Sequence, residues 1–140
     1  MSSLQKLIVL YGHSNCGKSD SLNRLKELLR LSGVSTSKTP HPNSDDPETF
    51  MYKGLVVCVA PAGDTGDIVK RNTRYFNAKK CDVAFSASRT KGGTVDVINQ
   101  YAEDQGVEVD WVQKSYEYSL DKPAEDFCNQ ETAQLLLEMI

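Results

Sequence analysis

The sequence predicts an α/β protein, a three-layer sandwich in which a mostly parallel sheet carries helices on both faces. Two observations predict it. Strand-like apolar runs alternate with amphipathic helix-like segments along the whole chain. Short turns that contain Gly or Pro separate most of them, as expected where helices return the chain to successive parallel strands. The 140 residues suit one domain over residues 1–140, and no internal repeat or linker divides them.

Several segments have the patterns of strands. Continuous apolar runs predict strands buried on both faces at residues 7–11 and 55–60, and residues 81–87, with Val83-Ala84-Phe85 at their centre, predict a third strand. Residues 107–112 alternate apolar and polar side chains, which is typical of a half-buried edge strand. Residues 35–49 are rich in Ser, Thr, Pro and Asp, and they predict a long loop.

Other segments have the apolar spacing of helices. Residues 18–31 place leucines on one face, and residues 67–78 form a second amphipathic segment. Thr94 is the expected N-cap of a third helix. A last helix opens at Asp121 and Pro123. Its expected inward side chains are Phe127, Cys128, Leu135, Leu136 and Met139.

The composition excludes several classes of protein. No apolar run approaches the roughly 18 residues that span a bilayer, and the N-terminus lacks a secretion signal, so we expect a cytoplasmic protein with no membrane partner. The net charge of −3 argues against nucleic acid as a partner, because such binding needs concentrated Lys and Arg. The cysteines lack zinc-ligand spacing, so we expect reduced thiols, with Cys58 and Cys81 packed as small apolar groups.

One motif carries most of the chemistry. It reads Gly12-His13-Ser14-Asn15-Cys16-Gly17-Lys18-Ser19 and fits G-x-x-x-x-G-K-[ST] at every defined position. The motif directly follows an apolar strand and opens an amphipathic helix, which is the context that distinguishes it from a chance match on a structural turn. The two glycines allow the backbone to turn its amide groups onto an anion, and the start of the helix adds a positive dipole end.

With this motif the chain resembles the P-loop NTPase superfamily, and most of all its small kinase-type members. The resemblance is specific over residues 7–31. It implies ATP and Mg²⁺ as cofactors held by residues 12–19, a catalytic role for Lys18 at the β- and γ-phosphates, and a magnesium-binding hydroxyl at Ser19. No Asn-Lys-x-Asp segment for reading guanine is present, which favours adenine as the base.

Asp64 is the candidate second magnesium ligand. Members of the superfamily place an aspartate at the end of a neighbouring strand, and Asp64 follows the strand at 55–60 after Pro61-Ala62-Gly63. Asp67 is a rival for this role. The structural alternative is that Asp64 caps the next helix or shapes the turn.

Arg89 is the candidate catalytic cation. It follows the strand at 81–87, and the carboxyl ends of parallel strands share the edge where open α/β sheets bind ligands, so it reaches the same edge as residues 12–19. An arginine there can neutralise charge on a transferring phosphoryl group. The alternative is a surface arginine in a Gly-rich turn. Arg71 and Arg74 have helical spacing and face either an anionic acceptor or solvent.

Three functions fit these residues. The first is Mg²⁺-dependent transfer of a phosphoryl group from ATP to a small anionic or hydroxyl acceptor, with the loop at 35–49 on the acceptor side. The second is a slow ATPase, a nucleotide-dependent switch that acts on a protein partner. The third is a module that binds the nucleotide without turnover. The long polar loop favours the first, and the lack of an evident general base favours the second.

Overall fold

The chain folds into an α/β structure around one sheet. The structure is a computed structural model that describes residues 4–12, 17–35, 45–114 and 122–140. Within these ranges the strands are β1 (Lys6–Tyr11), β2 (Val34–Ser35), β3 (Glu48–Tyr52), β4 (Leu55–Ala60), β5 (Val83–Ser88) and β6 (Val109–Gln113). The helices are α1 (Lys18–Ser32), α2 (Gly66–Lys79), α3 (Gly93–Gln105) and α4 (Lys122–Glu138). None of these helices combines the length and the apolar character needed to cross a membrane.

The sheet is mostly parallel, as predicted. Its six strands run in the order β2-β3-β4-β5-β1-β6, and the pairs β4–β5, β5–β1 and β1–β6 are parallel. The predicted strands at 7–11, 55–60 and 81–87 are therefore β1, β4 and β5, which occupy central positions. Central strands are covered on both faces, which explains their predominantly apolar sequences.

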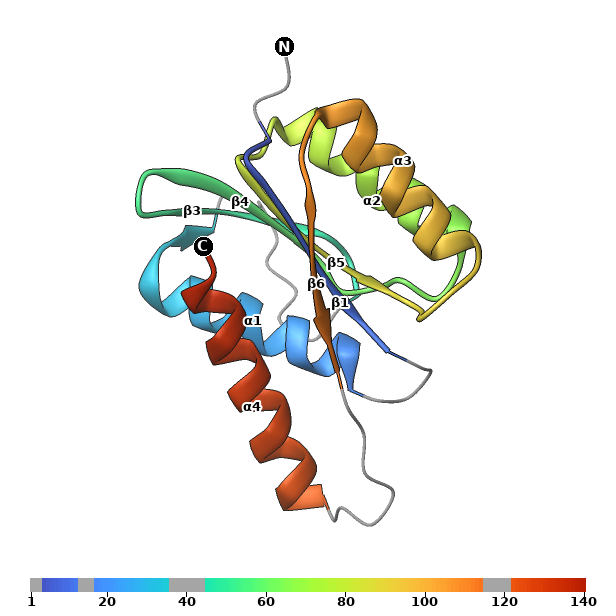
Figure 1. Ribbon diagram of the computed structural model, residues 1–140. Coiled ribbons are helices and arrows are strands. Elements are labelled where there is room, and N and C mark those ends of the chain that lie inside the picture. Colours follow the sequence, from blue (N-terminus) through green and yellow to red (C-terminus); the bar gives the residue numbers. More distant parts are fainter. Residues whose placement is uncertain (1–3, 13–16, 36–44, 115–121) are drawn as a thin grey trace.

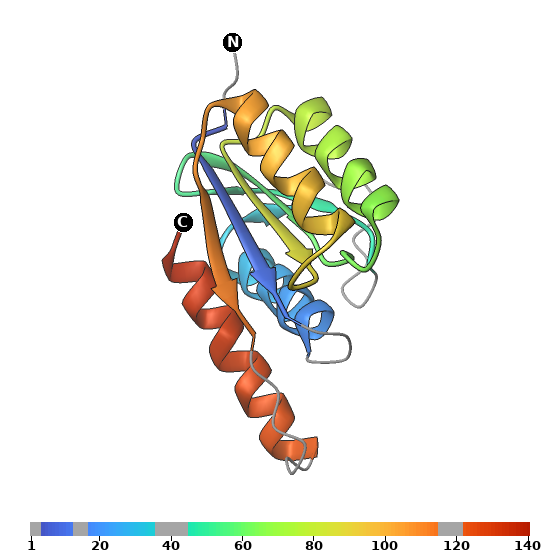
Figure 2. The same ribbon diagram turned by 45° about the vertical axis from the view of Figure 1, so that its right-hand side comes forward.

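Helices cover both faces of the sheet, so the predicted arrangement of one sheet between two layers of helices is confirmed. Figures 1 and 2 show α2 and α3 together on one face and α1 and α4 together on the other. Each face of the sheet has its own hydrophobic core, and alternate residues of β1 belong to one or the other. Leu7 and Val9 pack with α2 and α3, whereas Ile8 and Leu10 pack with α1 and α4. Cys58 belongs to the α2–α3 core and is buried, as predicted.

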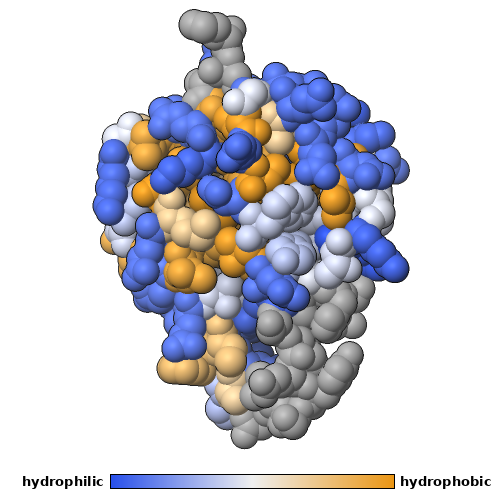
Figure 3. Space-filling view, viewed as in Figure 1, coloured by the Kyte–Doolittle hydropathy of each residue, from blue (hydrophilic) through white to orange (hydrophobic). Residues whose placement is uncertain are grey.

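The predicted edge strand is also confirmed. β6 lies at one end of the sheet and pairs with β1 alone among the described strands. Val109 and Val112 are half-buried, whereas Asp110 is exposed. Figure 3 shows apolar and near-neutral atoms in the region of β6, bordered by hydrophilic atoms over α2 and α3. Trp111 remains 37% exposed on this edge and meets the ring of Tyr11 edge-on, with the centroids 5.7 Å apart.

The prediction of a loop over residues 35–49 is wrong at both ends, because Ser35 belongs to β2 and residues 48 and 49 belong to β3. Residues 48–52 form β3, which pairs antiparallel with β4 through a two-residue turn at Lys53 and Gly54, both with positive φ. Two polar side chains of β3 are buried because distant residues satisfy them. Glu48 accepts hydrogen bonds from Arg30 of α1, and the Thr49 hydroxyl lies 2.6 Å from that of Tyr75. Residues 36–44 of the predicted loop lie outside the described residues.

The predicted inward face of the last helix is confirmed for Leu136 but is wrong for Phe127 and Leu135. Phe127 and Leu135 are 64% and 50% exposed, and Cys128 and Met139 are only partly buried. The buried residues of α4 are Asn129, Ala133 and Leu136. They face α1, whose first turns are polar, so a polar residue packs there in place of an aromatic one. Asp121, the predicted start, lies outside the described residues, and α4 begins at Lys122.

Candidate functional site

The candidate site lies where the connections that leave two neighbouring strands diverge. β1 and β5 are adjacent and parallel, but the chain leaves β1 toward α1 on one face and leaves β5 toward α3 on the other (Figure 2). Such a switch point opens a crevice at the carboxyl edge of the sheet, where open α/β sheets bind ligands. Gly12, directly after β1, and residues 17–19, at the start of α1, are the described residues of the motif, and they lie at this point.

Backbone contacts bring three loops together at this edge. The Gly12 amide donates a hydrogen bond to the carbonyl oxygen of Ser88 at 3.3 Å, which joins the ends of β1 and β5. Gly63, after β4, packs against the end of β5 so closely that a Cβ there would lie 2.1 Å from the carbonyl oxygen of Ala87. The chain segments that carry the 12–19 motif, Asp64 and Arg89 therefore meet at one edge of the sheet.

Gly17 begins α1 in a conformation that favours glycine. Its φ of 93° and ψ of 17° lie in the left-handed region, and it is the N-cap of the helix. Its carbonyl oxygen accepts the first helical hydrogen bond, from the Ser21 amide at 2.9 Å. Glycine has no side chain with which to cap the amides of the first turn, and a helix start of this kind favours an anion. Of the predicted phosphate-binding residues, His13, Ser14, Asn15 and Cys16 lie outside the described residues.

Lys18 turns its ammonium group back toward the start of the motif. Its side chain is buried, and Nζ donates a hydrogen bond to the carbonyl oxygen of Gly12 at 2.6 Å. The positive charge therefore lies between the end of β1 and the first turn of α1. A cation at this place, beside the N-terminus of a helix, can attract the charged groups of a phosphate chain.

The two predicted magnesium ligands lie at this edge without contacting each other. The Ser19 hydroxyl donates a hydrogen bond to the carbonyl oxygen of Pro61 at 3.1 Å. The Asp64 carboxylate, three residues farther on, is exposed and forms no ion pair within the described ranges. Thr65 is the N-cap of α2, since its hydroxyl accepts a hydrogen bond from the Ile68 amide at 3.2 Å. The alternative that Asp64 caps this helix is therefore wrong. Asp67 lies exposed in the first turn of α2.

The two predicted ligand groups, the hydroxyl of Ser19 and the carboxylate of Asp64, would suit a metal ion whose other ligands are water or substrate oxygens. Among the described residues, no group of three or more His, Cys, Asp or Glu side chains could hold a metal ion. Mg²⁺ does not require such a cage, because it usually retains water and takes one or two protein oxygens together with the phosphates of its substrate. The hydroxyl of Ser19 and the carboxylate of Asp64 fit this pattern.

Arg89 is exposed at the end of β5 on a loop that Thr94 holds. The Thr94 hydroxyl accepts hydrogen bonds from the Arg89 amide at 3.1 Å and from the Ser88 hydroxyl at 3.0 Å. The prediction that Thr94 is the N-cap of α3 is therefore wrong. Gly92 is the N-cap, and Thr94 instead binds the preceding loop through these hydrogen bonds. The Arg89 guanidinium pairs with no other described residue and extends into solvent.

Arg71 and Arg74 are not brought to the centre of the site. Both are exposed on α2, which starts at this edge with Gly66 and then leads away from it. At 1.5 Å per residue, they lie roughly 7.5 and 12 Å along the helix from Gly66. The structure thus separates them from the first turn of α1 by the thickness of the sheet, since α1 and α2 cover opposite faces.

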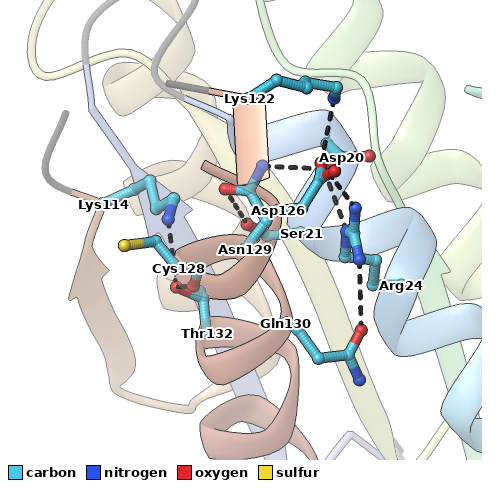
Figure 4. Close-up of polar contacts among 10 residues, drawn as sticks. All are labelled: Asp20, Ser21, Arg24, Lys114, Lys122, Asp126, Cys128, Asn129, Gln130 and Thr132. Carbon is cyan, nitrogen blue, oxygen red and sulfur yellow. Dashed lines mark hydrogen bonds and ion pairs between the residues drawn. The ribbon is translucent and has the colours of Figure 1, made fainter. Parts of the chain in front are cut away.

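Sequence reasoning missed a polar group on α4 that contacts the first turn of α1, directly after the motif (Figure 4). Asn129 is buried, and its Nδ2 donates to Asp20 at 2.7 Å while its Oδ1 accepts from the Ser21 hydroxyl at 3.2 Å. A Cβ on Gly17 would lie 2.5 Å from the same Oδ1. A signal existed, because Asn129, Ala133 and Leu136 have the i, i+4, i+7 spacing of one helical face.

Lys114 forms a second link to α4 near the same edge. Its amide donates to the carbonyl oxygen of Tyr11 at 2.7 Å, which continues the β1–β6 pairing. Its buried side chain turns toward α4 and donates to the Thr132 hydroxyl at 3.2 Å (Figure 4). Both links fasten α4 to the part of the molecule that carries the motif.

Comparisons of the chain with protein-family models, with curated proteins and with solved structures found no significant match.

Proposed function

We propose that this chain is a P-loop protein, a small kinase-type member of that superfamily, which binds ATP and Mg²⁺ at residues 12–19. Its proposed activity is transfer of a phosphoryl group to a small anionic or hydroxyl acceptor. One observation carries the proposal. The G-x-x-x-x-G-K-[ST] segment leaves β1 at the switch point of the sheet and enters α1 through a left-handed Gly17.

Each residue of the site has a proposed task. The amides at the start of α1 and the Lys18 ammonium hold the phosphate chain by charge and by hydrogen bonds. Ser19 and Asp64 would hold Mg²⁺, which when bound supplies charge neutralisation at the phosphate oxygens. Arg89, whose guanidinium is exposed at the same edge, would approach the transferring phosphoryl group.

A slow ATPase that acts as a switch on a protein partner is the second candidate. One observation favours it: part of the expected acceptor loop is a strand. Glu48 and Thr49 belong to β3, and their side chains are buried in contacts with α1 and α2, so neither is open to a small acceptor. This shortens the segment that was expected to hold an acceptor.

The experiment measures ATP consumption by the purified chain with Mg²⁺, alone and with nucleosides, nucleotides and phosphosugars. ADP release that an acceptor stimulates, with a phosphorylated product, supports phosphoryl transfer. Slow release that no acceptor stimulates supports the switch, and binding without release supports a non-hydrolysing module. Titration calorimetry with ATP–Mg²⁺ and GTP–Mg²⁺ tests the expected preference for adenine. Absence of ATP–Mg²⁺ binding in both calorimetry and thermal-shift measurements would refute all three.

A further inference from the structure

The carboxamide of Asn129 connects α4 to the first turn of α1. Both of its polar ends are used: Nδ2 donates to Asp20 Oδ2 at 2.7 Å, and Oδ1 accepts from Ser21 Oγ at 3.2 Å. The side chain is buried, so these bonds replace water. Asp20 and Ser21 directly follow Lys18 and Ser19, the residues to which the phosphates and the metal are assigned.

The surrounding charges fix Asp20 as well. Arg24, one turn later on α1, donates to Asp20 Oδ2 at 3.0 Å and to Asp126 Oδ1 at 3.0 Å (Figure 4). Asp126 also pairs with Lys122 at 2.9 Å. Asp126 and Asn129 are three residues apart on α4, but only Asn129 contacts Asp20 and Ser21 directly, whereas Asp126 contacts Arg24 and Lys122.

Asn129 also limits the space at Gly17. The position of a Cβ on Gly17 lies 2.5 Å from Asn129 Oδ1 and 3.2 Å from Nδ2. The carboxamide thus packs against the Cα of Gly17 at the point where the motif enters the helix. Movement of Gly17 toward α4 would require Asn129 to give up its hydrogen bonds to α1.

We infer that Asn129 is a positioning residue for the first turn of α1, where Gly17, Lys18 and Ser19 of the motif lie, an inference that rests on the proposed function. It touches neither nucleotide nor metal. Its bonds to Asp20 and Ser21, and its contact with Gly17, hold the first turn of α1 so that the amides and Ser19 are directed toward the phosphates before they bind. Such preorganisation increases affinity because less freedom is lost on binding.

The bonding pattern explains why asparagine suits this position. An aspartate would place a second carboxylate against Asp20, and like charges in contact are unfavourable. An alanine would leave Ser21 and Asp20 without these partners and would open space beside Gly17. The exchange of both residues, Asp20→Asn together with Asn129→Asp, restores one amide–carboxylate hydrogen bond with donor and acceptor reversed.

The test compares Asn129→Ala with Asp126→Asn, a matched change in the same α1–α4 contact that removes ion pairs to Arg24 and Lys122 but does not touch Gly17. Three quantities are measured for each: the Kd for ATP–Mg²⁺, amide hydrogen exchange of residues 17–21 without nucleotide, and the midpoint of urea unfolding. For Asn129→Ala we expect a Kd about tenfold higher, because hydrogen bonds to a charged group are lost, and faster exchange at residues 17–21. For Asp126→Asn we expect less than about a twofold change in Kd.

The reciprocal exchange supplies a rescue. Asn129→Asp alone is expected to weaken ATP–Mg²⁺ binding at least as much as Asn129→Ala, and the double exchange with Asp20→Asn is expected to recover part of the loss. If Asn129→Ala and Asp126→Asn raise the Kd equally, or if neither does, the positioning role is refuted. If Asn129→Ala fails to fold, Ser21→Ala removes only one of the two bonds, and an unchanged Kd and exchange rate in that variant would refute the inference.

Failure of the proposed function would give a different result from failure of the positioning role. If the unmodified chain does not bind ATP–Mg²⁺, the nucleotide assignment fails, but amide exchange still reports on the loop. Faster exchange at residues 17–21 in Asn129→Ala but not in Asp126→Asn would then support the positioning of this segment by Asn129. Equal exchange in both variants would overturn it.

Discussion

The hydroxyl of Ser19 donates a hydrogen bond to the carbonyl oxygen of Pro61 across 3.1 Å. This bond joins the first turn of α1 to the loop after β4, although the two residues are far apart in the sequence. The hydroxyl assigned to Mg²⁺ therefore already points toward the loop that carries Asp64. Binding of the metal would require this oxygen to offer a lone pair to the ion, which a hydroxyl that donates its hydrogen to Pro61 can do.

Ser19→Ala should remove the magnesium-dependent part of ATP affinity. The variant loses one metal ligand and the bond to Pro61, so we expect the Kd for ATP with Mg²⁺ to rise about tenfold while the Kd measured in EDTA changes little. Ser19→Thr keeps the hydroxyl and is the matched control. Titration calorimetry with and without Mg²⁺ measures both constants. An equal loss with and without the metal would assign Ser19 to the Pro61 contact alone.

Lys18→Met should abolish most nucleotide binding and leave the fold intact. Methionine keeps an unbranched stem in the buried position but removes the charge that donates to the Gly12 carbonyl group. Loss of a charge-assisted contact to the phosphates predicts a Kd about a hundredfold higher. Lys53→Met, at an exposed hairpin turn, is the control for loss of one positive charge. ATP–Mg²⁺ affinity within twofold of the unmodified chain in Lys18→Met would refute the assignment of the motif.

Asp64→Asn should weaken ATP–Mg²⁺ binding more than metal-free ATP binding. The substitution preserves the shape of the side chain but removes the negative charge that a divalent cation prefers. Asp67→Asn is the matched change, three residues on, in the first turn of α2. Because a carboxylate near a helix N-terminus stabilises the helix, it should cost about 0.5 kcal/mol of stability without altering the response to Mg²⁺. The reverse outcome would transfer the metal role from Asp64 to Asp67.

Gly63→Ala should destabilise the whole domain. A Cβ at Gly63 would lie 2.1 Å from the carbonyl oxygen of Ala87, and backbone of a central strand cannot yield as a side chain would. We expect a loss of about 3 kcal/mol in the free energy of unfolding, measured by urea denaturation with circular dichroism. Gly93→Ala is the control, because a Cβ on Gly93 meets nothing within 4 Å. A similar loss in both variants would show that the approach of Gly63 to β5 is not the cause.

The central strands and the position of the motif were predictable because local sequence determines them. The apolar runs of β1, β4 and β5 follow from burial on both faces, and the order of elements places their carboxyl ends at one edge. The start of β3 was not predicted from the sequence, because Glu48 and Thr49 are polar and follow a segment that is typical of a loop. They are buried only because Arg30 and Tyr75, distant in the sequence, provide partners.

The contacts of the candidate site were harder to predict. Spacing made Gly17, Lys18 and Ser19 candidates, because their proposed roles depend on backbone geometry within one segment. The contacts of Asn129 depend on how α4 packs against α1. An inward-facing polar residue on α4 can be predicted only when the surface that it faces is known to be polar. The sequence also places Asp64 in a loop without determining where its carboxylate points, because turn geometry there depends on the packing of Gly63 against β5.

Glu48 should be more important for stability than the buried lysine beside it. The Glu48 carboxylate receives hydrogen bonds from Arg30 and lies 3.7 Å from the ammonium group of Lys26, and both Lys26 and Glu48 are buried. Burial lowers the pKa of Lys26, which reflects the cost of keeping that charge away from water. Lys26 also donates to the carbonyl oxygen of Asp46 at 3.2 Å.

Glu48→Gln leaves two cations without their shared counter-charge, so we expect a loss of about 3 kcal/mol in the free energy of unfolding. Lys26→Met replaces the buried ammonium by an apolar group of similar length and leaves the Glu48–Arg30 pair in place, so its effect should stay within about 1 kcal/mol. Urea unfolding followed by circular dichroism measures both. Equal losses would mean that Lys26 contributes as much as the carboxylate, and that the connection between α1 and β3 depends on the pair rather than on Glu48 alone.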